Sequence, residues 1–180
     1  MLFRSHGGDP DRVFVAGLSA GGAMAAVLAQ AYPDVFAAAG VHSGLPAGAA
    51  SDMPSAFAAM RQGGAPVSAD RIRVPMIVFH GDRDATVHST NGDRIVTQAG
   101  GTKAASVEVR SGRSDGGVDF ERSVYRDGSG RSFCEQWILH GAGHAWAGGS
   151  AAGTYTDPAG PDASAEMLRF FLAVGDSASA

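Results

Sequence analysis

Short apolar runs alternate along this chain with segments in which apolar residues recur at helical spacing. Runs of strand length, rich in alanine and valine, lie at residues 13–16, 36–43 and 74–80. Helical patterns are expected at residues 20–32, 54–61, 91–100 and 163–174. A helix between successive buried strands is typical of a parallel sheet, so the pattern predicts an α/β fold.

Weaker strand patterns in the second half of the chain lie at residues 106–110, 120–126 and 132–139. The tetrapeptide Asp-Gly-Ser-Gly at residues 127–130 separates the last two and is typical of a hairpin turn. Residues 112–119 and 140–161 are rich in glycine and small polar residues, and we expect both to be loops. Neither a repeat nor a linker divides the chain, which predicts one domain over residues 1–180.

The first apolar run ends in Gly-Leu-Ser-Ala-Gly, and the first helical pattern begins directly after it. A serine on a sharp turn between strand and helix is typical of a nucleophile elbow. Gly17 and Gly21 lack a Cβ, so strand and helix can approach closely around Ser19. The alternative interpretation is that Ser19 only caps the helix.

An activated serine needs a base and an orienting acid, and elbow hydrolases place them downstream in the order Asp, His. Asp84 is the candidate acid, because it lies in a turn directly after the most apolar strand. Asp82 lies two residues nearer to that strand, and capping of the turn is the alternative role for its carboxylate. We therefore expect Asp84 to accept a hydrogen bond from the base.

The candidates for the base are His6, His42, His80, His88, His140 and His144. Chain order favours the two histidines after the last strand. His144 lies in a loop next to a glycine, whereas His140 still belongs to the strand end, so His144 is the predicted base. His42 and His80 end strands, and we expect structural roles for both. His88 follows the acid turn closely and is expected to border the cleft.

Composition excludes several classes of function. The 180 residues are 44% hydrophobic with a formal net charge of −4, which suits one globular domain. The 14 basic residues are scattered along the chain, so no nucleic-acid partner is expected. No apolar run approaches the roughly 20 residues of a membrane-spanning helix, and no membrane partner is expected.

Motifs for metals and cofactors are absent from the sequence. Cys134 is the only cysteine, and the His-Glu-x-x-His pattern is missing, so no metal site is expected. Lys103 is the only lysine, and no phosphate-binding loop surrounds it. No Gly-x-Gly-x-x-Gly follows a strand, and we expect no cofactor.

Three segments together resemble the polyhydroxybutyrate depolymerase and feruloyl-esterase-like group of α/β-hydrolases. They are Gly-Leu-Ser-Ala-Gly-Gly-Ala-Met at residues 17–24, His-Gly-Asp-Arg-Asp-Ala-Thr-Val-His at 80–88 and Gly-His-Ala-Trp-Ala-Gly-Gly at 143–149. Tyr-Pro-Asp-Val-Phe-Ala-Ala at residues 32–38 is similar to the segment after that family's nucleophile helix. The resemblance implies an α/β-hydrolase fold, with a mostly parallel sheet and helices on both faces. It also implies Ser19 as nucleophile, Asp84 as acid and His144 as base.

The resemblance further implies a serine esterase that acts on a small ester, a polyester, or an acetylated or feruloylated polysaccharide. Attack by Ser19 would give an acyl-enzyme, with the N–H of Ala20 as one oxyanion donor. Trp146 and His88 are the expected substrate contacts. The alternative is a weakly active or non-catalytic assembly module of the same fold, and an acyltransferase or peptidase would use the same triad.

Two features depart from the family pattern. The family's upstream strands and His-Gly oxyanion loop have no counterpart before Ser19, and Ala147 replaces its usual proline. We therefore expect an N-terminally truncated sheet in which residues 13–15 form an edge with exposed apolar side chains. Such edges pair readily with a second copy, which predicts a homodimer. Residues 1–6 lack a signal-peptide pattern; many relatives are secreted, and the sequence assigns no localisation.

Overall fold

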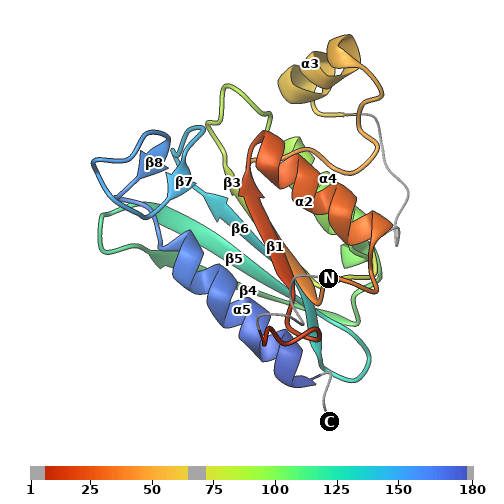
Figure 1. The fold of residues 1–180 in the computed structure, drawn as a ribbon. Coiled ribbons are helices and arrows are strands. Elements are labelled where there is room, and N and C mark those ends of the chain that lie inside the picture. Colours follow the sequence, from red (N-terminus) through yellow and green to blue (C-terminus); the bar gives the residue numbers. More distant parts are fainter. Residues whose placement is uncertain (1–6, 65–71, 178–180) are drawn as a thin grey trace.

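A six-stranded sheet with helices on both faces forms the body of the molecule (Figure 1). The computed structural model describes residues 7–64 and 72–177. The strands are β1 (Phe14–Leu18), β2 (Ala38–His42), β3 (Met76–Gly81), β4 (Ser106–Arg113), β5 (Asp119–Arg126) and β6 (Ser132–Leu139). The helices are α2 (Ala20–Ala31), α3 (Met53–Gln62), α4 (Thr90–Gln98) and α5 (Ala163–Ser177), with a 3₁₀ turn η1 (Gly101–Lys103). Two short strands, β7 (Trp146–Ala147) and β8 (Thr156–Asp157), pair outside this sheet.

The sheet order is β1-β2-β3-β6-β5-β4, and its first four strands are parallel. The last two strands, β5 and β4, are antiparallel and join the sheet through β6. Phe79 on β3 lies opposite Trp137 on β6, although the chain between them contains a helix and two strands. The expected mostly parallel α/β sheet is confirmed, and the carboxyl ends of β1, β2, β3 and β6 lie at one edge of it.

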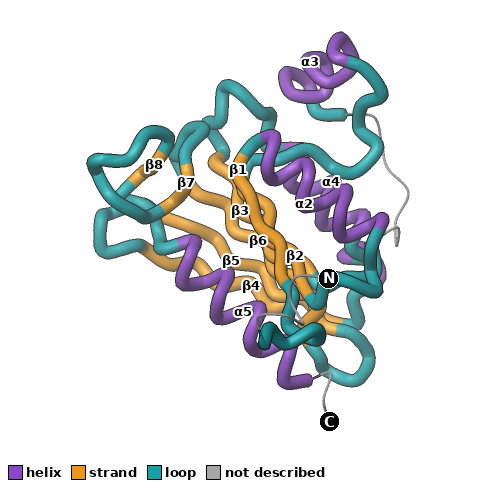
Figure 2. Tube along the Cα trace, viewed as in Figure 1, coloured by secondary structure: helices purple, strands orange, loops and turns teal. Residues whose placement is uncertain are grey.

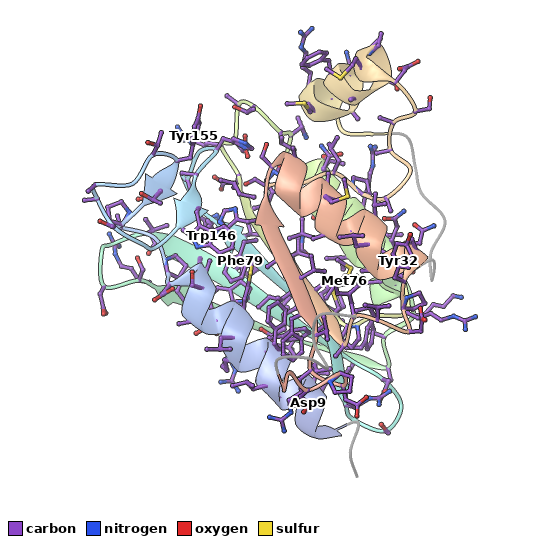
Figure 3. The ribbon with its side chains drawn as sticks, viewed as in Figure 1. Asp9, Tyr32, Met76, Phe79, Trp146 and Tyr155 are labelled. Atoms are coloured by element: carbon purple, nitrogen blue, oxygen red, sulfur yellow. The ribbon has the colours of Figure 1, made fainter. Side chains whose placement is uncertain are left out.

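Helices α2 and α4 cover one face of the sheet and α5 covers the other (Figure 2). Successive side chains of a strand point to opposite faces, so β3 supplies both cores. Met76 and Val78 pack in the core beneath α2 and α4, whereas Ile77 and Phe79 pack beneath α5. Figure 3 labels Met76 and Phe79 on either side of the sheet. Burial on both faces explains why this strand is a continuous apolar run in the sequence.

The hairpin of β4 and β5 corrects one sequence prediction. Residues 112–119 were expected to form a loop, but both strands extend into this range and only residues 114–118 form the turn. Gly112 lies opposite Phe120, and a Cβ at Gly112 would lie 2.5 Å from the Phe120 ring. The Phe120 ring thus packs over this glycine across the strand pair, and a side chain at position 112 would displace the ring. The β7–β8 pair was likewise missed within the expected loop at residues 140–161.

β1 is an edge strand of the sheet: within the described residues, β2 is the only strand that pairs with it. Its apolar side chains are less exposed than expected. Phe14 is half-buried and stacks on Phe171 of α5, with ring centroids 4.9 Å apart. Val15 packs against the core on the opposite face. The homodimer through this edge stays a prediction. No helix within residues 7–64 and 72–177 combines the length and apolar character needed to cross a membrane.

Candidate active site

Ser19 occupies a strained turn between β1 and α2. Its backbone has φ 57° and ψ −118°, a region that residues with a side chain rarely adopt. The Ser19 N–H donates to the carbonyl of His42 at 2.9 Å, and its own carbonyl accepts from Ala23 at 2.9 Å. A Cβ at Gly17 would lie 2.3 Å from the carbonyl carbon of Gly21, so this close approach requires glycine.

The Ser19 side chain does not cap the helix. Ser19 stands at the N-cap position of α2, yet its hydroxyl accepts no capping hydrogen bond, so the alternative interpretation as a simple cap is wrong. In the described part of the chain, the N–H of Ala20 also has no protein acceptor. Both groups are available to a bound molecule at the positive end of the α2 dipole.

Asp84, which is buried, and His144, which is partly buried, form a pair that follows the ends of β3 and β6. His144 Nδ1 lies 2.7 Å from Asp84 Oδ2, and the two side chains are 12% and 0% exposed. The other oxygen, Oδ1, accepts the N–H groups of Thr86 at 2.9 Å and Val87 at 2.8 Å. Burial raises the pKa of the Asp84 carboxyl, but hydrogen bonds from Val87, His144 and Thr86 outweigh it, so the pKa lies below its usual value. Asp84 is therefore ionised at neutral pH and holds a proton on His144 Nδ1.

The alternative acid and base, Asp82 and His140, pair with each other. His140 Nδ1 lies 2.9 Å from Asp82 Oδ2, and the N–H of Gly141 donates to Asp82 Oδ1 at 2.7 Å. These side chains are 50% and 39% exposed, for His140 and Asp82 respectively, so water screens the interaction. Of the remaining histidines, His6 lies outside the described residues.

His80 holds the acid turn against the end of β3. Its ring is buried, and its Nε2–H donates to the carbonyl of Val87 at 2.8 Å, on the same turn that binds Asp84. Burial lowers the pKa of the His80 imidazole, so the ring is neutral. A Cβ at Gly81 would lie 2.3 Å from the carbonyl oxygen of Ala142. The glycine thus lets the loops of the acid and the base lie in contact.

An apolar cavity of about 370 Å³ lies beside Ser19. Its lining comes from α2 and the residue before it, from α3, from the chain between these helices and from the acid turn. It consists of Ser19, Ala20, Ala23, Met24, Val27, Leu45, Met53, Ala56, Phe57, Met60 and Val87. Val87 also donates to Asp84, so the cavity adjoins the acid turn. In the described part of the chain, no hydrogen bond joins Ser19 to His144.

The two expected substrate contacts lie outside this lining. Trp146 stacks on His42, with centroids 5.3 Å apart, and its indole N–H donates to Ser164 at 3.1 Å. His88 is exposed between α3 and α4, and its N–H donates to the carbonyl of Met60 at 2.7 Å. Substrate binding by Trp146 and His88 stays a prediction. Among the described residues, no group of three or more His, Cys, Asp or Glu side chains is placed to hold a metal ion.

Comparisons with known proteins identify relatives of this chain. Residues 2–117 match the profile of the family described as Esterase PHB depolymerase. Poly(3-hydroxyalkanoate) depolymerase C of Paucimonas lemoignei is 32% identical over 167 residues, which cover 86% of this chain and 38% of that protein. Feruloyl esterase B of Thermothelomyces thermophilus is 49% identical over 51 residues, or 28% of this chain and 18% of that protein.

Solved structures of esterases share the fold. Acetyl xylan esterase from Aspergillus awamori superposes with a TM-score of 0.62 at 24% identity, covering 79% of this chain and 57% of that one. A PHB depolymerase complexed with an R3HB trimer gives 0.59 at 20% identity, covering 91% and 52%. The expected α/β-hydrolase fold is confirmed, and this chain spans less than two thirds of each of these relatives.

Proposed function

This chain belongs to the Esterase PHB depolymerase family, and we propose that it hydrolyses carboxylic esters through Ser19, His144 and Asp84. The observation that carries the proposal is the partly buried hydrogen bond between Asp84 and His144, 2.7 Å long, at the edge of the sheet where the Ser19 turn also lies. A serine alone would be a weak nucleophile, and a base oriented by a carboxylate activates it.

The proposed reaction proceeds through an acyl-enzyme. Asp84 holds the proton on His144 Nδ1, which leaves the lone pair of Nε2 free to take the proton of the Ser19 hydroxyl. Ser19 Oγ attacks the ester carbonyl, and the N–H of Ala20 stabilises the oxyanion. The C–O bond to the alcohol breaks as His144 returns its proton to the alcohol oxygen. Water, deprotonated by His144, then releases the carboxylic acid and restores Ser19.

The cavity beside Ser19 supports an aliphatic substrate. Side chains from α2 and α3, including Met24, Met53 and Phe57, make its lining almost entirely apolar. Such a lining offers few partners to the hydroxyls of a polysaccharide, and leaving them unpaired would disfavour binding. We therefore propose short aliphatic esters and 3-hydroxyalkanoate oligoesters as substrates, in preference to acetylated or feruloylated polysaccharides.

Hydrolysis of p-nitrophenyl butyrate by the full chain tests the proposal. Ser19→Ala and His144→Ala should each lower kcat at least about 10⁴-fold, and the double variant should be little worse, because triad members act as a unit. His140→Ala is the matched control, since His140 lies in the exposed pair with Asp82. It should retain kcat within about threefold, since exposed ion pairs contribute little.

The outcomes separate the proposal from its alternatives. Equal turnover by the wild type and Ser19→Ala would contradict a serine esterase and favour the assembly module. Loss of activity in His140→Ala but not in His144→Ala would identify the other histidine as the base. Faster cleavage of an acetylated xylan than of an R3HB oligomer would contradict the proposed substrate class.

A further inference from the structure

His42 contacts both the nucleophile turn and the loop that carries the base. It is the last residue of β2, between β1 and β3, and it is fully buried. Its backbone carbonyl accepts the N–H of Ser19 at 2.9 Å. Its ring Nε2 accepts the N–H of Ala147 at 3.0 Å, three residues after His144. One residue thus joins two segments that are far apart in the chain.

The His42 ring is held in a single orientation. It stacks between Phe79, at 5.7 Å and 11°, and Trp146, at 5.3 Å and 29° (both labelled in Figure 3). Because Nε2 accepts from Ala147, the ring proton lies on Nδ1 and points to Ser43 Oγ at 3.2 Å. Burial, followed by the neighbouring His80 and His144, lowers the pKa of His42 to about 3, so the ring keeps its acceptor at neutral pH.

We propose that His42 is a positioning residue that sets the place of His144 relative to Ser19, an inference that rests on the proposed ester hydrolysis. Ser19 directly follows β1, and His144 lies in the loop after β6. Strands β2 and β3 lie between β1 and β6 in the sheet. The carbonyl of His42 fixes the first group, and its imidazole fixes the loop of the second. A misplacement of about 1 Å between reacting groups lowers rates about a hundredfold.

Two substitutions distinguish the role of the Nε2 acceptor from that of the aromatic ring. His42→Gln keeps an acceptor, because its Oε1 is as many bonds from Cβ as Nε2 is, but it loses the aromatic ring. His42→Phe keeps the stack between Phe79 and Trp146 and leaves the Ala147 N–H without an acceptor. Positioning predicts that kcat falls about a hundredfold in His42→Phe with KM nearly unchanged, and less than tenfold in His42→Gln. If the ring has only a structural role, kcat should fall more in His42→Gln than in His42→Phe.

The experiment measures kcat and KM for p-nitrophenyl butyrate in the wild type and both variants, with thermal unfolding to establish that each is folded. Hydrogen exchange of the Ala147 amide, followed by NMR, reports the bridge without any turnover. Protection should persist in the wild type and His42→Gln and be lost in His42→Phe. His140→Phe is the control for the substitution itself, because His140 is an exposed histidine that directly follows β6.

Folded His42→Phe with kcat within threefold of the wild type would overturn the inference, as would equal protection of Ala147 in all three proteins. A wild type no more active than Ser19→Ala would instead overturn the proposed function. The exchange data then decide alone whether His42 holds the loop of His144.

Discussion

Two carboxylate–imidazole pairs lie side by side at the end of the sheet, and their surroundings differ. The Asp84 side chain is fully buried and that of His144 is largely so, and backbone N–H groups donate to the second carboxylate oxygen. Asp82 and His140 have nearly the same separation, but their side chains are much more exposed to solvent. A low-dielectric environment strengthens the first interaction and orients its imidazole, whereas solvent weakens the second. Burial, rather than distance, distinguishes the pair that we propose for catalysis.

The buried His42 predicts a specific loss of stability at acid pH. Its pKa is about 3 in the folded protein, against an ordinary value of 6.5. Between these values the unfolded chain binds a proton that the folded protein does not, so the free energy of unfolding falls as the pH falls below 6.5. The slope from this one group approaches about 1.4 kcal/mol per pH unit and vanishes below pH 3.

Urea unfolding of the wild type and His42→Gln at pH 7, 6, 5 and 4 measures this contribution. The variant has no titrating group at position 42, so the two stabilities should converge as the pH falls. The lowered pKa of His80 acts in the same direction but is common to both proteins. Parallel curves would show that His42 is not buried in the neutral form.

At the residue scale, much of the site was predictable from local patterns. The glycines around Ser19 predict its turn, and chain order predicts that Asp84 and His144 act together; the structure joins that pair. The contacts of His42 were not predictable, because they depend on β2 lying between β1 and β3. A weak signal existed: histidine ends β2, and histidines also stand at the ends of β3 and β6.

At the scale of the elements, an ion pair with the buried carboxylate of Glu135 links α5 to the sheet. Glu135 on β6 is 2% exposed. Arg122 donates to it at 2.8 and 3.1 Å, and Arg169 of α5 donates at 2.6 Å. Burial raises the pKa of Glu135, but the hydrogen bonds from Arg122 and Arg169 outweigh it and keep the group ionised. The ion cluster thus connects α5 with β5 and β6.

Removal of the two arginines should show how this cluster works. Arg122→Met with Arg169→Met leaves the Glu135 carboxylate buried without a partner, which should cost about 3 kcal/mol of unfolding free energy. Arg169→Met alone leaves both bonds from Arg122 and should cost about 1 kcal/mol. Arg110→Met removes an exposed pair with Glu108 and serves as control, with no measurable effect expected. Urea unfolding at pH 7 measures all three variants. An equal loss of unfolding free energy in Arg169→Met and in the double variant would contradict this account.

Whether a segment is a helix or a strand was easier to predict from the sequence than the residues at which it begins and ends. The apolar runs and helical patterns gave the main strands and all four longer helices of the described residues, because each has one clear period. The β4–β5 hairpin was shortened in the prediction, because Gly112 is a weak strand former whose place depends on Phe120 across the strand pair. β7 and β8 have two residues each and carry no periodic signal.

For the whole molecule, the outer side of β1 is the feature that bears on assembly. Within residues 7–64 and 72–177 no strand pairs with this side, and an edge of this kind is a template for another strand. We expect a twofold dimer through this edge, and light scattering at micromolar concentration measures it. Ala16, exposed on β1, gives the matched variant: Ala16→Lys should shift the protein to monomers, because a charge on an edge opposes pairing. A monomeric wild type would contradict the expectation, and would fit the half-burial of Phe14 and Val15.

The β5–β6 turn at residues 127–131 lies at the amino end of β6, whereas His144 follows its carboxyl end. Asp127 makes most of the hydrogen bonds of this turn: its side chain accepts from Ser129 and Arg131, and its N–H donates to the Arg131 carbonyl. Gly128 and Ser129 are exposed and contact none of the residues proposed for catalysis. Exposed turns of this kind tolerate inserted domains, because added loop length costs little conformational entropy. The molecule thus offers a grafting point, where a reporter or second module can be carried without disturbing its chemistry.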